Sequence, residues 1–508
     1  MPAYWNQRRI AIELERWLSR PFDDLSAWKR RPLDELLELL RRTGYVPITE
    51  PRPYQLVPIL LGMKYRNLMF YIGMGGGKTK IISDVFRFRQ QRGKCRRMLF
   101  LVDTVNAMFS IPRTLKHHYD GRVYVHSGPL DTCLRESLRS KADIVVIPYA
   151  HLPRLFFGGR DENGKWLPDM KTAQHYATYF DMIAFDEVHR LRDWRTLWWQ
   201  LCAAMTEVIP YRYGLTGTPT DRHFEGFWAM HWLVDRGATF GERWYVFKKA
   251  FFSNVDGRLF FRKRGLRLFN RLLKHRAIVY TNEEISKELP ALVYVRKYVA
   301  LDADVRKLYV EELSRYRARY GNVVDEEKLH SFTKLRQVAS GFVYTEEGVT
   351  VRLSYNPKYP VLLDLLRRIP EDRKCVIFYE FTASVEMIEG ALRDAGITQW
   401  LKIAGNVQRD TRAELEARFS DPEGPRVCVA QSRAGGTSLN LQAASVLIFY
   451  ETPVSYITRE QCIRRVHRDG QSETTYIVDL LIEDGIEERL LRNHETSGQM
   501  VGEVLDEW

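Results

Sequence analysis

Cysteine is scarce in this sequence, and the few cysteines that occur lie far apart. Six cysteines are spread over 508 residues, and none of them forms a C-x-x-C pair. This spacing predicts reduced residues in the protein core. It favours neither a disulfide framework nor a zinc site.

Long apolar runs are also missing. No run approaches the roughly 18 residues that a membrane-spanning helix requires. The first residues, MPAYWNQRRIAIELERW, have charges where a secretory signal would be apolar. We therefore expect a cytoplasmic protein that does not insert into a membrane.

Acidic residues are too few to balance the basic ones. Lysine and arginine number 77 against 64 aspartates and glutamates, which leaves a formal charge of +13. Residues 241–276 contain eleven basic and two acidic residues, with eight aromatic residues interleaved. Two interpretations of this segment stay open. It is either a basic helical face exposed to solvent or a surface that neutralises the phosphates of a polyanion. The aromatic residues are predicted to form its apolar underside, and the candidate phosphate contacts are Lys248, Lys249, Arg262, Lys263 and Arg264.

Short apolar runs alternate with helical segments in two regions of the chain, and no internal repeat is visible. Runs joined by long connections predict parallel sheets covered on both faces. The fold class is therefore α/β, with two sheets. The expected strands are LMFYI (68–72), MLFLV (98–102), IVVI (144–147) and MIAF (182–185), then CVIFY (375–379), VCVA (427–430), VLIFY (446–450) and TYIVDLL (475–481).

The pattern also predicts the domain boundaries and several local elements. The leucine spacing of residues 32–42 predicts a helix that begins at a proline. Turn signals predict hairpins at 156–167 and around Asp256-Gly257, and ALVYVRKYVAL (291–301) suggests an extended linker. The predicted parts are a small N-terminal helical extension (1–48), a first lobe (49–235), a helical, basic insertion and linker (236–345), a second lobe (346–490) and a tail (491–508).

The segment GMGGGKT follows the expected strand LMFYI and precedes KIISDVF, which has helical spacing. Its small residues would let backbone N–H groups approach phosphate oxygens at a helix N-terminus. Lys78 would then reach the outer phosphates, and the Thr79 hydroxyl would bind magnesium. The usual motif has a glycine where this chain has Ile72, so an ordinary turn stays open for this segment alone. The candidate cradle residues are Gly75, Gly76, Gly77, Lys78 and Thr79.

Nucleotide hydrolysis also requires a magnesium ligand and a group that orients water. DEVH follows the expected strand MIAF, so Asp186 would bind magnesium and Glu187 would polarise the attacking water. A surface turn is the alternative for an isolated acidic pair. LTGTPT adds the hydroxyls of Thr216 and Thr218 near this site.

QCIRRVHRDGQ lies in the second region and contains two arginines three positions apart. On a helix, Arg465 and Arg468 would share one face. Paired guanidinium groups that face a phosphate are what an arginine-finger mechanism needs. Surface salt bridges are the alternative.

The order of RPYQ, GMGGGKT, DEVH, LTGTPT, AGGTSLNL and QCIRRVHRDGQ resembles that of superfamily-two helicases, specifically the Swi/Snf-type DNA-translocating ATPases. The resemblance covers roughly residues 49–490. It implies two RecA-like lobes that bind ATP and Mg²⁺ in the cleft between them and ratchet along DNA. Ile72, Gly73 and Ser438 depart from the family pattern, which bears on rate or regulation.

The resemblance also implies roles for individual residues. Gln55 would contact the adenine base, and His189, Thr216 and Thr218 would couple DNA contact to hydrolysis. The implied ATP contacts further include Arg52, Tyr54 and Gln461, and the implied DNA contacts include Thr104, Tyr149, Gly435, Gly436 and Thr437.

Four functions stay open. A translocase would move on duplex, forked or branched DNA and remodel it or the proteins bound to it. A strand-separating helicase would need a wedge, for which the hairpins at 156–167 and 253–262 are candidates. An RNA-dependent ATPase and a non-hydrolysing ATP switch are the other two. The short form resembles prokaryotic or phage members, which suggests a prokaryotic or phage-infected cell, and the sequence identifies no protein partner.

Overall fold

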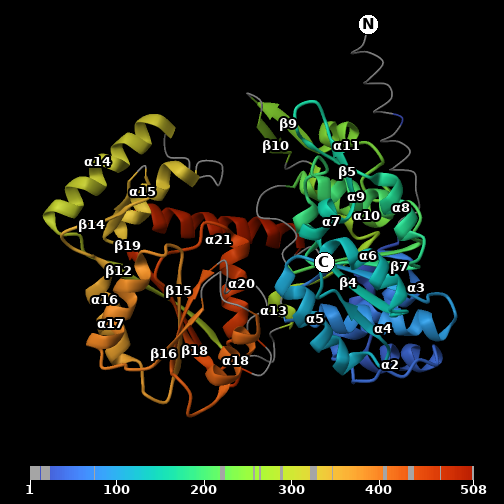
Figure 1. The fold of residues 1–508 in the computed structure, drawn as a ribbon, viewed down its shortest axis with the longest axis horizontal. Helices are drawn as coiled ribbons and strands as arrows, with labels where there is room; N and C mark the ends of the chain where they lie inside the picture. Colours follow the sequence, from blue (N-terminus) through green and yellow to red (C-terminus); the bar gives the residue numbers. More distant parts are fainter. Residues whose placement is uncertain are drawn as a thin grey trace, which may run out of the picture. The chain divides into compact units, whose positions relative to one another are not determined.

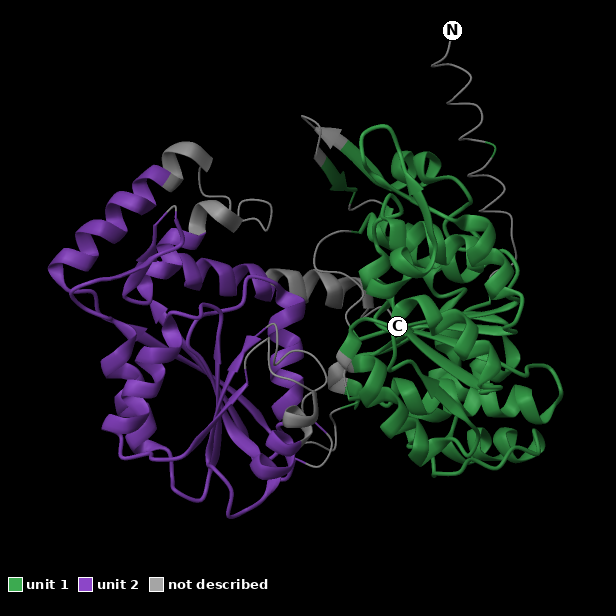
Figure 2. Ribbon diagram, in the orientation of Figure 1, with its two compact units in different colours: residues 1–285, 501–508 green, residues 286–500 purple. Residues whose placement is uncertain are grey.

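The computed structural model describes most of the chain, and it contains two compact units. The described residues are 12, 23–73, 75–217, 224–255, 258–262, 265–285, 290–320, 329–345, 347–403, 409–432, 440–468 and 471–505. Unit 1 comprises residues 1–285 and 501–508, and unit 2 comprises residues 286–500 (Figure 2).

Unit 1 is built on a parallel sheet with the strand order β11-β1-β8-β7-β2-β4-β3. All of these strands except β3 are buried along most of their length because helices flank the sheet, which explains their apolar runs; β3 is half-buried (Figure 1). The four strands predicted for this region are confirmed, while β3, β8 and β11 were not predicted. The strand bounds are β1 (Asn67–Ile72), β2 (Met98–Val102), β3 (Val123–Val125), β4 (Ile144–Pro148), β7 (Met182–Phe185), β8 (Tyr211–Thr216) and β11 (Ala277–Tyr280).

The helices and hairpins of unit 1 connect these strands. Both predicted hairpins form antiparallel pairs, β5–β6 and β9–β10. Their bounds are β5 (Phe157–Arg160), β6 (Trp166–Pro168), β9 (Phe252–Val255) and β10 (Arg258–Phe261). The helices are η1 (Leu25–Arg30), α2 (Leu33–Arg42), α3 (Pro53–Lys64), α4 (Lys78–Gln91), α5 (Val105–His118), α6 (Leu130–Arg139), η2 (Tyr149–His151), α7 (Leu152–Leu155), α8 (Met170–Ala177), η3 (Val188–Leu191), α9 (Leu197–Met205), α10 (Gly226–Asp235), α11 (Trp244–Phe251), α12 (Leu266–Leu273) and α13 (Asn282–Ile285).

The N-terminal segment is part of unit 1. The predicted helix forms as α2, and its Leu36 and Leu40 are buried in the same hydrophobic core as β1 and α3. Leu25 of η1 also joins this core, and its N–H donates to the Lys274 carbonyl at 3.1 Å. The buried leucines of α2 therefore pack within the first lobe.

The basic region 241–276 has the apolar underside that the sequence predicts. Phe240, Phe247, Phe251 and Phe269 are each at most 1% exposed. The Phe269 ring centroid lies 4.9 Å from that of Phe240 and 5.6 Å from that of Phe251. These rings pack against one another in edge-to-face and stacked pairs, so they are not available to stack on bases.

Unit 2 contains a second parallel sheet, with the order β12-β19-β18-β15-β17-β16. Its four predicted strands are confirmed, so the α/β class with two parallel-sheet lobes is also confirmed. The elements are β12 (Leu292–Val299), α14 (Ala303–Tyr320), α15 (Leu329–Ala339), β13 (Phe342–Tyr344), β14 (Thr350–Arg352), α16 (Lys358–Arg368), β15 (Lys374–Tyr379), α17 (Ser384–Asp394), β16 (Trp400–Ile403), α18 (Arg409–Ser420), β17 (Val427–Gln431), β18 (Ala444–Phe449), α20 (Tyr456–Val466), β19 (Thr475–Ile482) and α21 (Ile486–Leu505).

The expected insertion 236–345 is divided between the two units. β11 pairs with β1 at the edge of the first sheet, and β12 pairs along its whole length with β19 in the second. The segment 291–301, expected to be a linker, is therefore mostly an edge strand. Among the described residues, no helix has the length and hydropathy that crossing a membrane would take.

Candidate functional site: a phosphate loop and an acidic box in unit 1

The segment GMGGGKT connects β1 to α4, as the sequence predicts. Gly75 and Gly77 have φ values of +79° and +75°, which favour glycine. A Cβ added to Gly76 would lie 2.6 Å from Ile72 Cγ2 and 2.8 Å from Ile285 Cδ1. The loop therefore requires glycine at all three positions. Its backbone precedes the N-terminus of a 14-residue helix, where an anion is favoured.

Gln55 lies against this loop. Its side-chain Nε2 donates to the Gly76 carbonyl at 3.1 Å, and its Oε1 accepts from the Arg52 backbone N–H at 3.0 Å. The residue is buried in the first turn of α3, next to Tyr54. Gln55 thus braces the phosphate loop, and its contact with an adenine base stays a prediction.

DEVH follows β7 and lies beside the phosphate-loop lysine. The Lys78 Nζ is 3.2 Å from Glu187 Oε1. Thr216 Oγ1 at the end of β8 donates to Glu187 Oε2 at 3.1 Å, and His189 Nδ1 lies 3.2 Å from the same oxygen. His189 Nδ1 and Thr216 Oγ1 are themselves 3.0 Å apart. Residues from GMGGGKT, DEVH and LTGTPT therefore meet in one polar network.

The two carboxylates of the acidic box have opposite pKa shifts. Burial and the neighbouring charge of Glu187 raise the pKa of Asp186 to about 7. Burial alone would raise the pKa of Glu187, but the charge of Lys78 and the contacts with His189 outweigh it and lower this pKa. Glu187 is therefore an ionised acceptor at neutral pH.

The arginines of QCIRRVHRDGQ lie in unit 2 but do not share a helix face. Arg465 is in the last turn of α20, which ends at Val466. Arg468 follows the helix end, after His467, whose φ and ψ are −91° and 84°. The prediction of one shared face is wrong, because the helix stops between the two arginines. Gln461 is half-buried on the same helix.

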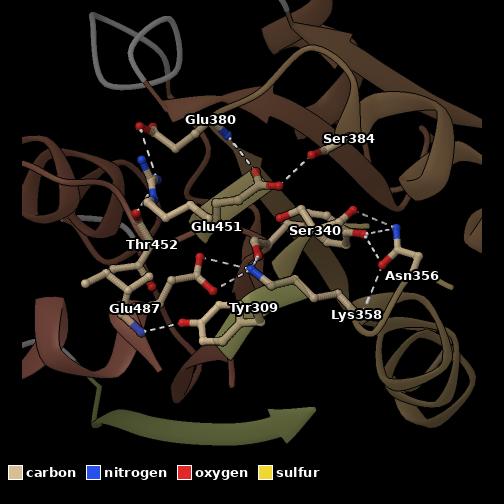
Figure 3. Close-up of polar contacts among 12 residues, drawn as sticks. Tyr309, Ser340, Asn356, Lys358, Glu380, Ser384, Glu451, Thr452 and Glu487 are labelled. Carbon is tan, nitrogen blue, oxygen red and sulfur yellow. Dashed lines mark hydrogen bonds and ion pairs between the residues drawn. The ribbon is translucent and has the colours of Figure 1, made fainter. Parts of the chain in front are cut away.

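A buried ionic cluster in unit 2 ties residues 332–341, FTKLRQVASG, to the sheet (Figure 3). Arg336 of this segment donates to the Thr452 carbonyl at 2.7 Å and lies 3.7 Å from Glu380. The Lys358 Nζ contacts both oxygens of Glu487 at 2.9 and 2.8 Å. These charges lie where β15 and β18 end, so they fix α15, α16 and α21 on the second sheet.

Two family models match the chain. The SNF2-related domain matches residues 102–341, and the helicase conserved C-terminal domain matches residues 357–470. The first model spans the acidic box, and the second spans the paired arginines. The chain belongs to the SNF2-related branch of the superfamily-two helicases. It contains matches to both of these domains.

Several SNF2-related and helicase proteins are similar to this chain. An uncharacterized ATP-dependent helicase from Mycoplasma pneumoniae is 26% identical over 231 residues, which are 45% of this chain and 22% of that protein. The DNA repair and recombination protein RAD54-like from Gallus gallus is 23% identical over 366 residues, 64% of this chain and 49% of that protein. The chain thus spans less than half of the length of these curated relatives.

A solved structure is also similar. It is the Sulfolobus solfataricus SWI2/SNF2 ATPase core in complex with dsDNA, at 17% sequence identity and a TM-score of 0.42. The match covers 91% of this chain and 98% of that one.

The residues of this SNF2-related chain fit ATP and magnesium. The glycine cradle would hold phosphates, and Thr79 and Asp186 offer the hydroxyl and carboxylate oxygens that Mg²⁺ accepts. Thr79 is the second residue of α4, and Asp186 directly follows β7. The described part of the chain has no group of three or more histidine, cysteine, aspartate or glutamate side chains placed to hold a metal ion. Mg²⁺ suits such a site, because it takes one or two protein ligands together with substrate phosphates.

The predicted DNA contacts have different outcomes. Tyr149 is fully buried, and its hydroxyl donates to the Asp186 carbonyl at 2.8 Å, so its predicted DNA contact is wrong. Thr104 caps α5 by accepting from the Ala107 N–H at 3.1 Å, and its DNA contact stays a prediction. Lys249 is exposed, while Lys248 and Arg262 are half-buried. The predicted residues Thr218, Lys263, Arg264, Gly435, Gly436 and Thr437 lie outside the described residues.

One ion pair near the site was not predicted. Arg190 Nε lies 2.5 Å from Asp103 Oδ1. Asp103 follows β2 and Arg190 directly follows DEVH, so the pair joins two neighbouring strand ends. The available signal was Asp103, a charged residue directly after the apolar run MLFLV.

Proposed function

We propose that the protein is a DNA-stimulated ATPase that uses ATP hydrolysis to translocate on DNA and remodel duplex, forked or branched DNA or the proteins bound to it. The observation that supports this most directly is the contact between Lys78 and Glu187. It joins a phosphate cradle to an ionised carboxylate that Thr216 and His189 hold in place. Transfer of a phosphoryl group to water needs both a phosphate-binding loop and a group that orients the water.

Each residue has a role in the proposed hydrolysis. The N–H groups of the glycine cradle and Lys78 bind and neutralise the phosphates of ATP. Glu187 orients the attacking water and accepts its proton. Bound Mg²⁺ would neutralise the charge that develops on the phosphates. Arg465 and Arg468 would supply positive charge from the second lobe.

DNA is the proposed track because the chain combines a helicase-family motor with a strongly basic surface. Phosphate contacts carry no sequence information, so binding should tolerate any sequence and weaken with salt. The RAD54-like relative is named as a DNA repair and recombination protein. RNA is the less favoured polymer.

The test is ATP turnover across a panel of nucleic acids. Duplex, forked and four-way DNA should stimulate phosphate release more than single-stranded DNA or RNA. Lys78→Ala should abolish stimulated turnover, since it removes the charge next to the phosphates. Stronger stimulation by RNA would identify an RNA-dependent ATPase, and nucleotide binding without any turnover would identify an ATP switch.

Strand separation is the second candidate function. The hairpin β5–β6 exposes Phe157 and Leu167, which are 46% and 44% accessible. The Phe157 and Trp166 rings pack 4.6 Å apart and stiffen the hairpin. A labelled forked duplex tests this function, because a translocase without a wedge hydrolyses ATP on the fork without releasing the strand.

A further inference from the structure

One tryptophan of unit 1 is exposed to solvent, and the other tryptophans that the structure describes are less exposed. Trp194 is 37% exposed, and among the described residues its side chain has no hydrogen bond and no ring contact. Trp198 stacks on Tyr149 with ring centroids 6.1 Å apart, and Trp199 stacks on Trp228 at the same distance. The large apolar surface of the Trp194 ring is therefore available to a partner that covers it.

Trp194 lies close to the acidic box along the chain. The turn η3 begins directly after Glu187, and Trp194 follows three residues after the end of η3. Arg190 of η3 forms the ion pair with Asp103, which directly follows β2. In open α/β sheets, ligands bind outside the carboxyl ends of the strands. The exposed ring thus belongs to a segment that starts from the ligand-binding edge of the first sheet.

The residues around Trp194 are mostly basic. Residues 190–195, RLRDWR, contain three arginines and one aspartate. Arg195 is exposed, and its Nε and Nη2 donate to the two Asp193 oxygens at 2.9 and 3.0 Å. This pair leaves the Arg195 Nη1 for another acceptor. An aromatic face beside guanidinium groups suits a nucleotide, because the ring stacks on the base and an arginine binds the phosphate.

The turn that carries Trp194 is held in place on both sides of the ring. Asp193 Oδ1 accepts from the Arg195 backbone N–H at 3.0 Å. The Asp193 carbonyl accepts from Thr196 Oγ1 at 2.9 Å, and Thr196 is the N-cap residue of α9. An aromatic side chain on a fixed backbone loses little conformational entropy when it binds. Trp194 is therefore presented in advance of any partner.

We propose that Trp194 stacks on an unpaired nucleobase while Arg195 binds an adjoining phosphate, which gives the protein a preference for forked over blunt duplex DNA. The inference rests on the proposed function, because it takes DNA as the bound polymer. In a continuous duplex, both faces of each base are covered by neighbouring bases, whereas the arms of a fork offer free faces. Every base has such a face, so the preference is for the structure of the DNA and not for its sequence.

Fluorescence anisotropy without nucleotide tests the proposal. Three labelled duplexes share one paired sequence and have blunt ends, single-stranded thymidine arms, or arms of abasic sites, which keep the phosphates but lack the bases. The wild type should bind the thymidine fork about 5- to 150-fold more tightly than the abasic fork, which is the effect of stacking one base. Because the two forks carry the same charge, phosphate contacts contribute equally to both affinities.

Three variants separate stacking from general effects on the fold. Trp194→Ala should bind the thymidine and abasic forks equally, and Trp194→Phe should retain most of the wild-type difference. Tyr179→Ala is the matched control, because Tyr179 is an aromatic residue of the same unit and is 45% exposed. It should keep the full difference. Affinity for the blunt duplex shows that each variant is folded.

A Trp194→Ala protein that still prefers the thymidine fork to the abasic fork would overturn the inference. So would a wild-type protein without this preference, and the exposed ring would then belong to a protein contact. Failure of the proposed function has another signature, which is a wild-type protein that releases no phosphate from ATP on any nucleic acid. The binding comparison is independent of that result, because it contains no ATP.

Discussion

The Glu187 carboxylate lies at the centre of the polar network in unit 1. Lys78 approaches one of its oxygens, while Thr216 and His189 approach the other. The backbone of Glu187 has a φ of +45°, a strained value for a side-chain-bearing residue. Strain of this kind persists where the surrounding contacts hold it in place, and here those contacts aim the carboxylate at Lys78.

Glu187→Gln should reduce DNA-stimulated ATP turnover by about 10²- to 10⁴-fold, the usual contribution of a general base. The amide has the same shape but neither the charge nor the basicity. Phosphate release at saturating ATP and DNA measures the effect. The matched control is Glu207→Gln, which alters an exposed carboxylate of the same unit. Wild-type turnover in Glu187→Gln would show that another group orients the water.

Single residues were predictable where chemistry and chain position agreed. Lys78 and Glu187 each follow a predicted strand of one parallel sheet, so their proximity could be expected from the positions of the two motifs. Tyr149 also follows a strand, yet its ring is buried and its hydroxyl supports the Asp186 carbonyl. A tyrosine suits a core and a surface equally well, so its direction depends on the packing around it.

Among the elements, the aromatic underside of the basic region is the most self-contained. Phe269 of α12 contacts the rings of Phe227, Phe240 and Phe251 and has no exposed surface. These buried rings pack on one another and form the apolar core of the region.

Phe269→Ala should destabilise this region by about 3–5 kcal/mol, because it leaves a cavity among fixed rings. Phe260→Ala is the control, since Phe260 is 51% exposed, and it should change stability by less than about 0.5 kcal/mol. Hydrogen exchange of the α11 and α12 amides measures both. Equal effects of the two variants would mean that the ring cluster adds no stability.

The helix α20 is fixed to the second sheet by a buried ion pair. Arg459 donates to both Asp479 oxygens, at 2.6 and 2.7 Å, and both residues are at most 5% exposed. Asp479→Ala should destabilise unit 2 by about 3–5 kcal/mol, because it leaves a buried guanidinium without its acceptor. Hydrogen exchange of α20 and β19 amides gives the value.

An exposed ion pair on the same unit serves as the control. Arg368 and Asp364 are 2.8 Å apart on α16 with exposed side chains. Asp364→Ala should cost at most about 1 kcal/mol. The Arg459→Met/Asp479→Leu double variant should recover most of the stability, since it removes both charges. A double variant as unstable as Asp479→Ala would contradict this account.

Strands could be predicted from the sequence where burial on both faces gives a continuous run of apolar residues. β1, β2, β4 and β7 are continuous apolar runs because both of their faces are covered. β8 and β12 were missed because polar residues interrupt them. Arg212 in β8 donates to the Val234 carbonyl at 2.7 Å, and β12 exposes charged residues at a sheet edge.

At the scale of the whole molecule, the net positive charge would attract a polyanion before any specific contact forms. The chain carries a formal charge of +13. In the basic region, Lys249, Arg267 and Arg271 are exposed. A polyanion that binds there releases counterions in proportion to the phosphates neutralised.

Changing Lys249, Arg267 and Arg271 together to glutamine should weaken duplex DNA binding and flatten its salt dependence by up to about 0.9 in log–log slope per residue. Fluorescence anisotropy over a salt series measures the slope. Arg41→Gln/Lys94→Gln, at exposed positions outside the region, is the matched control. Equal slopes for the two variants would place the DNA grip elsewhere.

The sequence by itself determined the α/β class, the two sheets and the motifs that share a sheet edge. It did so because apolar runs, glycine clusters and charged motifs can each be recognised within a short stretch of the chain. The tertiary structure alone decided where α20 ends, that Tyr149 turns inward, and that Ile285 lies on the phosphate loop. Those outcomes depend on contacts between residues far apart in the chain, whose free energies exist only after the core has packed.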